Sequence, residues 1–285
     1  MKLSANMIKY FHTYGFEKMI DVFAEAGIEG IDFNADIPEF YSGSYDKAYY
    51  QEILKHAQDK GVEFVQAHAP FASSFPDEEQ TKQRFLEIVD GMKYASWLDS
   101  KMIVVHPCNH LDCDEPGNLE RAFESNLEFY KKLIPYSEEY GIKIALENIN
   151  FKGRTGITST AERLAALYDE LHNDAFVICF DVGHMNILGL DPADAIRTLG
   201  KRIKCLHVHD NMGDADTHTL PYYGNIQWES VMTALAEAGY EGDFSYEASA
   251  FIKNLPEELY PEGLRYMSLV GHQLIRRYEH YKAQQ

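Results

Sequence analysis

Six side chains that can bind a metal or transfer a proton stand at or near the ends of short apolar runs. In chain order they are His68, His106, Glu147, Asp181, His207 and Glu247. Imidazole nitrogen combined with carboxylate oxygen suits Zn²⁺, Mn²⁺, Co²⁺ or Fe²⁺ better than Mg²⁺ or Ca²⁺, which prefer oxygen ligands alone. A ring of such groups in one cavity would be costly without a cation, because unpaired buried charges lose their hydration. The pattern therefore predicts a divalent-metal site.

Other candidate ligands lie close to this series in the sequence. His184 belongs to an Asp-x-x-His pattern, and Asp216 and His218 form an Asp-x-His pattern in a polar stretch. Each has an ordinary alternative, because a strand-end carboxylate can cap a helix and a lone histidine can be a simple polar residue. His209 and Asp210 could serve to orient the ligands. The prediction rests on the whole series rather than on any one residue.

Short runs rich in Val, Ile and Phe alternate along the chain with longer segments of helical period. We predict strands at residues 2–7, 30–33, 63–68, 102–106, 143–147, 177–181, 203–209 and 243–247. We predict helices at residues 16–26, 46–60, 77–97, 118–140, 160–171, 193–199, 228–238 and 256–280. Eight strand–helix units in about 250 residues indicate a (β/α)8 TIM barrel, an α/β fold that would occupy residues 1–285 as a single domain. An open, doubly wound sheet is the alternative, but it gives no reason for reactive residues to end strand after strand.

The composition is that of a globular protein with a strong excess of acidic residues. Lys and Arg number 26 against 45 Asp and Glu, which gives a formal net charge of −19. Proteins that grip phosphate backbones concentrate Lys and Arg instead. No apolar run approaches the roughly 20 residues that span a bilayer, and the N-terminus has no signal-peptide core. Because the four cysteines form no C-x-x-C pair, we expect a cytoplasmic protein with reduced cysteines.

Short motifs extend the pattern of reactive residues along the whole chain. They are His68-Ala69-Pro70, Val105-His106-Pro107, Leu146-Glu147-Asn148, Phe180-Asp181-Val182-Gly183-His184, His207-Val208-His209-Asp210, Gly224-Asn225-Ile226-Gln227-Trp228 and Tyr246-Glu247. Together they resemble the xylose-isomerase-like barrel superfamily. That superfamily contains isomerases and epimerases of sugars and sugar phosphates, and also endonuclease IV.

The resemblance implies two alternative ligand sets. In the isomerase and epimerase branch one metal is held from four strands by residues that match Glu147, Asp181, His207 and Glu247. The two Glu residues there also act as acid and base, and the residue that matches His184 touches the substrate. Endonuclease IV holds three zinc ions with the same four residues and five more, which match His68, His106, His184, Asp216 and His218. All nine positions are filled here, so the ligand set fits both branches.

Departures from the family pattern limit what can be carried over. Some sugar epimerases have a second carboxylate shortly after the strand-five Glu and an arginine shortly after the strand-seven His. Neither group occurs here in residues 148–153 or 210–214. The Gly-Glu-Gly of the nuclease is also absent, because residues 222–225 read Tyr-Tyr-Gly-Asn. Each branch is therefore an imperfect match.

The charge of the predicted rim loops separates the two enzyme hypotheses. Their basic residues are Lys152, Arg154 and Lys253. Their acidic residues are Asp36, Glu39, Asp46, Asp112, Asp114, Glu115, Asp191, Asp210, Asp214 and Asp216. A duplex-binding mouth should show the reverse, because Lys and Arg contacts to phosphate supply most of the non-specific affinity. We therefore expect a small-molecule partner, with neither a nucleic acid nor a membrane.

We favour a divalent-metal-dependent isomerase or epimerase of a sugar, a sugar phosphate or a related hydroxy-ketone, with no organic cofactor. Glu147 or Glu247 would remove the proton next to a carbonyl that the metal polarises, and the other carboxylate would return one. His184 would bind substrate, and Lys152 and Arg154 could bind a phosphate. The alternatives are a multi-zinc phosphodiesterase of the endonuclease IV type and a barrel that binds a ligand without turnover.

Overall fold

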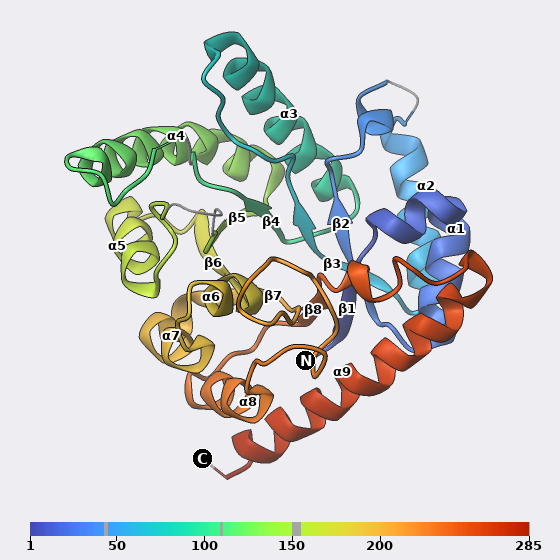
Figure 1. Ribbon diagram of the computed structural model, residues 1–285. Helices are drawn as coiled ribbons and strands as arrows, with labels where there is room; N and C mark the ends of the chain where they lie inside the picture. The colour runs from blue at the N-terminus through green and yellow to red at the C-terminus, as the bar shows by residue number, and fades with distance from the viewer. Residues whose placement is uncertain (43–44, 109–110, 150–154, 285) are drawn as a thin grey trace.

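Eight parallel strands form one sheet that rolls into a barrel in the described part of the chain (Figure 1). This computed structural model describes residues 1–42, 45–108, 111–149 and 155–284. The strands are β1 (Leu3–Asn6), β2 (Gly30–Asn34), β3 (Glu63–His68), β4 (Met102–Val105), β5 (Lys143–Glu147), β6 (Phe176–Asp181), β7 (Ile203–His207) and β8 (Phe244–Tyr246). Their order is β7-β6-β5-β4-β3-β2-β1-β8, and a parallel bridge between Val208 and Tyr246 closes the ring. The predicted (β/α)8 barrel is confirmed.

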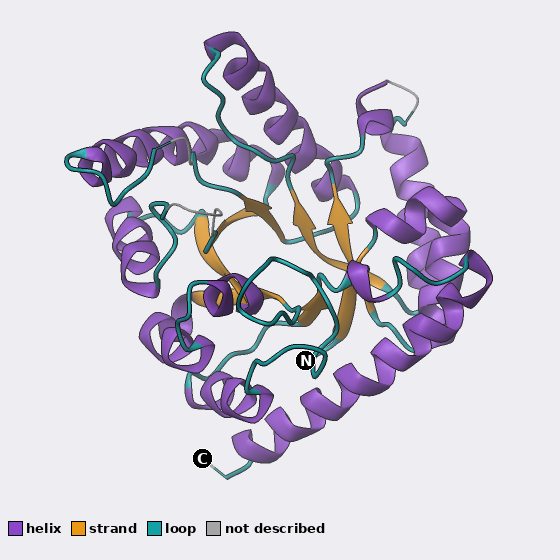
Figure 2. Ribbon diagram, viewed as in Figure 1, coloured by secondary structure: helices purple, strands orange, loops and turns teal. Residues whose placement is uncertain are grey.

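Helices surround the barrel on its outer side (Figure 2). They are α1 (Ile8–Ala26), α2 (Lys47–Asp59), α3 (Glu78–Trp97), α4 (Asn118–Tyr140), α5 (Ala161–Leu171), α6 (Val182–Ile187), α7 (Pro192–Leu199), α8 (Trp228–Glu237) and α9 (Tyr260–Lys282). Side-chain caps fix several of their starts. Asp46, for example, accepts a hydrogen bond from the Tyr49 backbone N–H at 2.9 Å. No helix among the described residues is long and apolar enough to cross a membrane.

Two helices near the barrel rim differ from the sequence-based expectation. α1 begins at Ile8 rather than at residue 16, and Gly15, with φ 72° and ψ 178°, breaks it into two helical pieces. α6 was not expected, because its six residues are too few to show a periodic apolar pattern. α6 nevertheless matters for the site, because it carries His184.

Strands β4, β7 and β8 end one or two residues earlier than predicted. The candidate residues His106, His209 and Glu247 therefore lie just beyond the strands. Backbone hydrogen bonds still hold this part of the rim, since the Glu247 N–H donates to the Val208 carbonyl at 3.0 Å. The backbone at Glu247 is thus held by the neighbouring strand end although it stands outside β8.

Alternate side chains of each barrel strand point into the barrel. On one side the interior is apolar, where a separate cluster is formed by Val104, Ala145, Cys179 and Cys205. On the other side it is polar and buried, with Ser4, Asp32, Gln66 and Ser245. Two residues after Ala145, Cys179 and Cys205, the same strands present Glu147, Asp181 and His207. The register pairs Glu147 with Cys179 and Asp181 with His207, which brings the strand ends to one rim.

The main hydrophobic core lies between the barrel and the surrounding helices. α9 packs against α1, α8 and β1, so the last helix lies against the first strand. At Gly271 a Cβ atom would lie 2.5 Å from Leu3 Cδ1. A larger residue at this position would displace the buried Leu3 side chain, so glycine allows the close approach of α9 to β1.

Candidate metal-binding active site

Glu147 lies among the predicted ligands, at the end of β5, with only 1% of its surface exposed. Its Oε1 lies 2.8 Å from His207 Nδ1, and its Oε2 lies 2.9 Å from His106 Nε2. Burial opposes ionisation of this carboxyl, but His207 and His106 outweigh burial and hold the pKa of Glu147 well below its ordinary value. Glu147 is therefore an ionised carboxylate between two imidazoles.

The other residues of the predicted single-metal set surround Glu147. His207 Nδ1 lies 3.8 Å from Glu247 Oε2. Ligand atoms of Glu147, Asp181 and His184 lie within 4.8 Å of one another. Asp181 Oδ1 also accepts a hydrogen bond from the His184 backbone N–H at 2.6 Å and so caps α6. The structure thus brings Glu147, Asp181, His207 and Glu247 together at the C-terminal ends of four strands.

His68 and His106 form one flank of this group. Their Nε2 atoms lie 3.0 Å apart, and His68 Nε2 lies 3.8 Å from Glu147 Oε2. His68 Nδ1 lies 2.7 Å from the Ala69 carbonyl oxygen. Because a carbonyl can only accept, neutral His68 donates its proton there and keeps Nε2 as the acceptor or ligand atom. Phe71 stacks on His106, with ring centroids 5.5 Å apart, and covers this flank.

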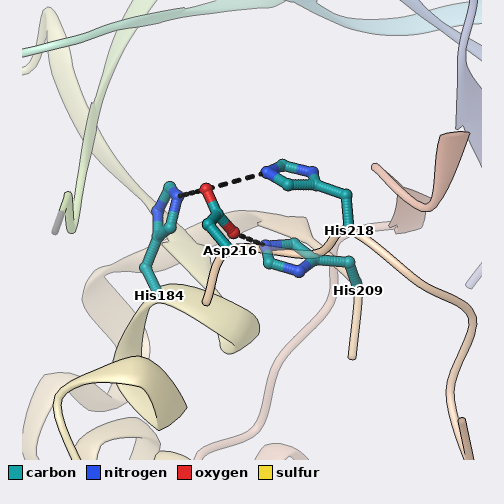
Figure 3. Close-up of side chains that lie close together, drawn as sticks. All are labelled: His184, His209, Asp216 and His218. Carbon is teal, nitrogen blue, oxygen red and sulfur yellow. Dashed lines mark hydrogen bonds and ion pairs between the residues drawn. The ribbon is translucent and has the colours of Figure 1, made fainter. Parts of the chain in front are cut away.

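A second group of ligand atoms stands next to the first and shares His184 with it. Its members, whose ligand atoms lie within 4.8 Å of one another, are His184, His209, Asp216 and His218 (Figure 3). Asp216 lies in the middle, with Oδ2 at 3.0 Å from His218 Nε2 and 3.4 Å from His184 Nε2. Its other oxygen lies 3.7 Å from His209 Nε2. The rings of His209 and His218 are stacked with centroids 4.0 Å apart. α6 supplies His184 to this second group, and the segment after β7 supplies the other three residues.

Asp216 sets the protonation of the histidines around it. Burial opposes protonation of His184, but Asp181 and Asp216 raise its pKa to about 10. Burial likewise opposes protonation of His218, whose pKa Asp216 and Glu247 raise to about 9. The pKa of Asp216 is lowered by the same two histidines, although partial loss of hydration at this half-exposed side chain opposes the shift. At neutral pH and without metal, this group therefore holds protons on His184 and His218.

Asp210 fixes the loop that carries part of the second group. Its Oδ2 accepts hydrogen bonds from Trp228 Nε1 at 2.8 Å and from the Tyr222 backbone N–H at 2.9 Å. Its backbone also pairs with that of Thr219, next to His218. The sequence left open whether Asp210 orients ligands directly. In the structure its contacts anchor the loop, and so act on Asp216 and His218 through the backbone.

Buried polar atoms at this rim lack a well-aligned hydrogen-bond partner among the described residues. They are Glu147 Oε2, Asp181 Oδ2, both ring nitrogens of His209, and His207 Nε2, which faces Asp32 and not the carboxylates of Glu147 and Glu247. Buried polar atoms are normally paired, and uncompensated buried charge is costly. Carboxylate and imidazole lone pairs gathered in this way suit a divalent cation with nitrogen and oxygen ligands. The donor set therefore fits the predicted cation.

A cavity of about 350 Å³ opens at the rim. Its described lining residues are Asn6, Ile8, Asn34, His68, Phe71, Ala72, His106, Glu147, Ile149, His184, Asp216, His218, Glu247 and Ser249. Asp181 and His207 are absent from this lining and are fully buried below it. None of the described lining residues is Lys or Arg. Lys152 and Arg154, the predicted phosphate ligands, lie outside the described residues.

Sequence reasoning missed two polar residues of the cavity wall, Asn6 from β1 and Asn34 from β2. Asn6 Oδ1 accepts a hydrogen bond from the Ile8 N–H at 3.0 Å, and Asn34 Oδ1 accepts one from the Asp36 N–H at 2.8 Å. Each side chain is therefore held at its oxygen. The sequence did contain a pattern that could have predicted them, because Asn6 and Asn34 end their strands in the same way as the charged residues of later strands.

A closed (β/α)8 barrel with carboxylates and imidazoles at the C-terminal rim defines the class of this protein. Residues 20–269 match the family described as xylose isomerase-like TIM barrel, and the chain belongs to that family. The predicted resemblance is thereby confirmed. The crystal structure of a D-tagatose 3-epimerase-like protein matches 100% of this chain and 99% of its own, with a TM-score of 0.77 and 25% sequence identity.

Curated relatives of this chain differ in their described functions. An uncharacterised protein of Methanocaldococcus jannaschii is 33% identical over 203 residues, which cover 69% of this chain and 68% of that protein. A probable endonuclease 4 of Acholeplasma laidlawii is 24% identical over 241 residues, which cover 75% and 80%. A D-psicose 3-epimerase of Ruminiclostridium cellulolyticum is 26% identical over 237 residues, which cover 81% and 78%. Both branches implied by the sequence motifs are thus represented.

Proposed function

We propose that this protein is a divalent-metal-dependent isomerase or epimerase of a sugar or a related hydroxy-ketone, phosphorylated or not. The observation that carries the proposal is that the carboxylates of Glu147 and Glu247 both lie close to the His207 imidazole. Glu147 Oε1 lies 2.8 Å, and Glu247 Oε2 3.8 Å, from His207 Nδ1. Both carboxylates line the cavity, so a substrate there would have a base and an acid within reach. The similarity to a D-psicose 3-epimerase and a D-tagatose 3-epimerase-like protein supports this reaction class.

The proposed cation is Zn²⁺, Mn²⁺, Co²⁺ or Fe²⁺. The residues that would hold it are Glu147, Asp181, His207 and Glu247. When bound, such an ion supplies a Lewis acid that polarises a carbonyl and acidifies the neighbouring C–H group. One glutamate takes that proton, and the other returns a proton at the opposite face or at the neighbouring carbon. His184 would bind a substrate hydroxyl, and Phe71 would pack against the sugar and exclude water from its side.

A substrate screen tests this proposal. Purified protein is loaded separately with Mn²⁺, Co²⁺ or Zn²⁺ and incubated with a panel of ketoses and ketose phosphates. At least one sugar should be converted, and a chelator should abolish the conversion. If the substrate is phosphorylated, Lys152→Ala and Arg154→Ala should raise KM for it more than for its unphosphorylated counterpart. Failure of every metal-loaded form to convert any sugar on the panel would contradict the proposal.

A second candidate function is that of a multi-metal phosphodiesterase of the endonuclease IV type. The observation in its favour is the second group of ligand atoms, centred on Asp216 and next to the first. Similarity to a probable endonuclease 4 supports it as well. The net charge of −19 opposes duplex binding, so we propose an enzyme without a nucleic-acid partner. We also propose, as a separate point, that the enzyme is cytoplasmic and has no membrane partner. Zinc-loaded protein should neither bind nor cleave duplex DNA with an abasic site near physiological salt, and rapid cleavage would reverse the ranking of the two candidates.

A further inference from the structure

The barrel interior below the proposed metal centre is polar on one side. Ser4 of β1, Asp32 of β2 and Ser245 of β8 are 0% exposed, and Gln66 of β3 is 1% exposed. The opposite side of the interior is packed with small apolar side chains from β4 to β7. A carboxylate inside such a barrel is notable, because Asp is almost never fully buried unless it is paired.

The contacts of Asp32 converge on one of its oxygens. Oδ2 accepts hydrogen bonds from Gln66 Nε2 at 2.9 Å and from Ser245 Oγ at 3.4 Å. The same oxygen lies 3.2 Å from His207 Nε2. Gln66 Nε2 also donates to the Leu206 carbonyl at 3.2 Å, next to His207 in the chain. The amide therefore ties Asp32 to the strand that carries the metal-ligand candidate.

His207 stands between this carboxylate and the proposed metal centre. Its Nδ1 faces Glu147 and Glu247 at 2.8 and 3.8 Å, whereas its Nε2 faces Asp32. Without metal, the contact to Asp32 is an ion pair that is not aligned as a hydrogen bond, and Nε2 has no hydrogen-bond partner among the described residues. Asp32 is thus the carboxylate placed to accept a hydrogen bond from the Nε2–H group.

We propose that Asp32 is a positioning residue for the metal ligand His207. By accepting a hydrogen bond from Nε2–H, the Asp32 carboxylate keeps the single proton of the neutral imidazole on Nε2 and leaves the Nδ1 lone pair for the cation. Its negative charge makes Nδ1 more basic. Histidines that bind metals commonly donate their second N–H to a carboxylate or a carbonyl, and loss of that partner typically costs about 10–100-fold in metal affinity or activity. The inference rests on the metal centre proposed above and adds a residue from β2, a strand that supplies none of the proposed ligands.

The test compares Asp32→Asn and Asp32→Ala with the wild type in two measurements. Competition with a chelator gives the affinity for Co²⁺, and the visible absorption of bound Co²⁺ reports on the ligand geometry. Affinity should fall by about 10–100-fold, more in Asp32→Ala than in Asp32→Asn, and the absorption bands should shift. Asp243→Asn is the matched control, because that carboxylate accepts the Lys2 backbone N–H at 2.7 Å, whereas the described carboxylates that face His207 are Asp32, Glu147 and Glu247. Its Co²⁺ affinity should equal that of the wild type.

Circular dichroism and thermal melting establish which variants are folded. If an Asp32 variant does not fold, Gln66→Met serves as the substitute test. It removes the amide that holds Asp32 Oδ2 and should also weaken Co²⁺ binding. Wild-type affinity and spectrum in folded Asp32→Asn would overturn the inference. A wild-type protein that binds no Co²⁺ would overturn the metal centre and the inference together. Weakened Co²⁺ binding in the variants, with no sugar converted by the wild type, would support the inference and contradict only the proposed reaction.

Discussion

Glu147 and Glu247 have two tasks in the proposed reaction, because each would hold the cation and each would also transfer a proton. Replacing either by Gln leaves an oxygen for the metal but removes the proton acceptor. The turnover number should therefore fall by about 10²–10⁴-fold. Metal content should fall less than in Asp181→Ala or His207→Ala, where a ligand disappears. Steady-state kinetics together with elemental analysis measures both quantities, and full-rate turnover by both Gln variants would rule out a carboxylate base.

The histidines of the second group should link metal binding to pH. Asp181 and Asp216 raise the pKa of His184 to about 10 against the effect of burial, and the pKa of His218 is raised to about 9. Both are therefore protonated near neutral pH without metal, and they must lose protons to bind a cation. Affinity at this group should rise as the pH increases toward these values.

Calorimetric titration with Zn²⁺ in two buffers of different ionisation enthalpy measures this linkage. The heat should differ between the buffers, because binding releases protons that the buffer takes up. Asp216→Asn, which removes the one negative charge next to both histidines that helps to raise their pKa values, should release fewer protons. Identical heats in the two buffers would show that the histidines are already neutral, contrary to this account.

Among the structural elements, the loop between β7 and α8 depends most on one side chain. Asp210 accepts hydrogen bonds from Trp228 Nε1 and from the Tyr222 N–H at its base. Asp210→Asn should lower the free energy of unfolding by about 1–3 kcal/mol, the cost of leaving buried donors poorly satisfied. It should also weaken metal binding at the second group more than at the first. Urea unfolding and metal titration measure these effects, and Asp214→Asn, in the exposed part of the same loop, is the control expected to match the wild type.

The same elements explain how much of the site the sequence could predict. Strand-end His, Asp and Glu residues predicted a shared rim, because parallel strands in a barrel end on one face. His184 was found through its spacing from Asp181, although the helix that carries it is too short to be predicted from periodicity. Asp32 was missed because it lies within β2, two residues before the strand end. An alternating pattern does not say which face of a strand points into the barrel, so a buried carboxylate there looks like a solvent-exposed one.

At the scale of the whole molecule, the residues that stabilise the barrel and the residues of the candidate site lie in different places. The large apolar core lies between the strands and the outer helices, whereas the reactive side chains occupy the interior and the rim. The same architecture therefore supports different reactions in related proteins, and the fold alone does not choose among them. The choice depends on the loops, and those of this chain are acidic, which favours a small substrate over a nucleic-acid duplex.

Proton transfer by the paired carboxylates is the central claim, and turnover in D₂O tests it most directly. The wild-type protein, loaded with its preferred metal, converts its ketose substrate in D₂O, and the product is analysed by mass spectrometry and NMR. Deuterium should appear on the carbon next to the carbonyl, because Glu147 or Glu247 takes the substrate proton and exchanges it with solvent. Glu147→Gln, at equal metal loading, should incorporate far less. Product that forms at the normal rate without deuterium would contradict the claim, since the hydrogen would then move without passing through an exchangeable carboxylate.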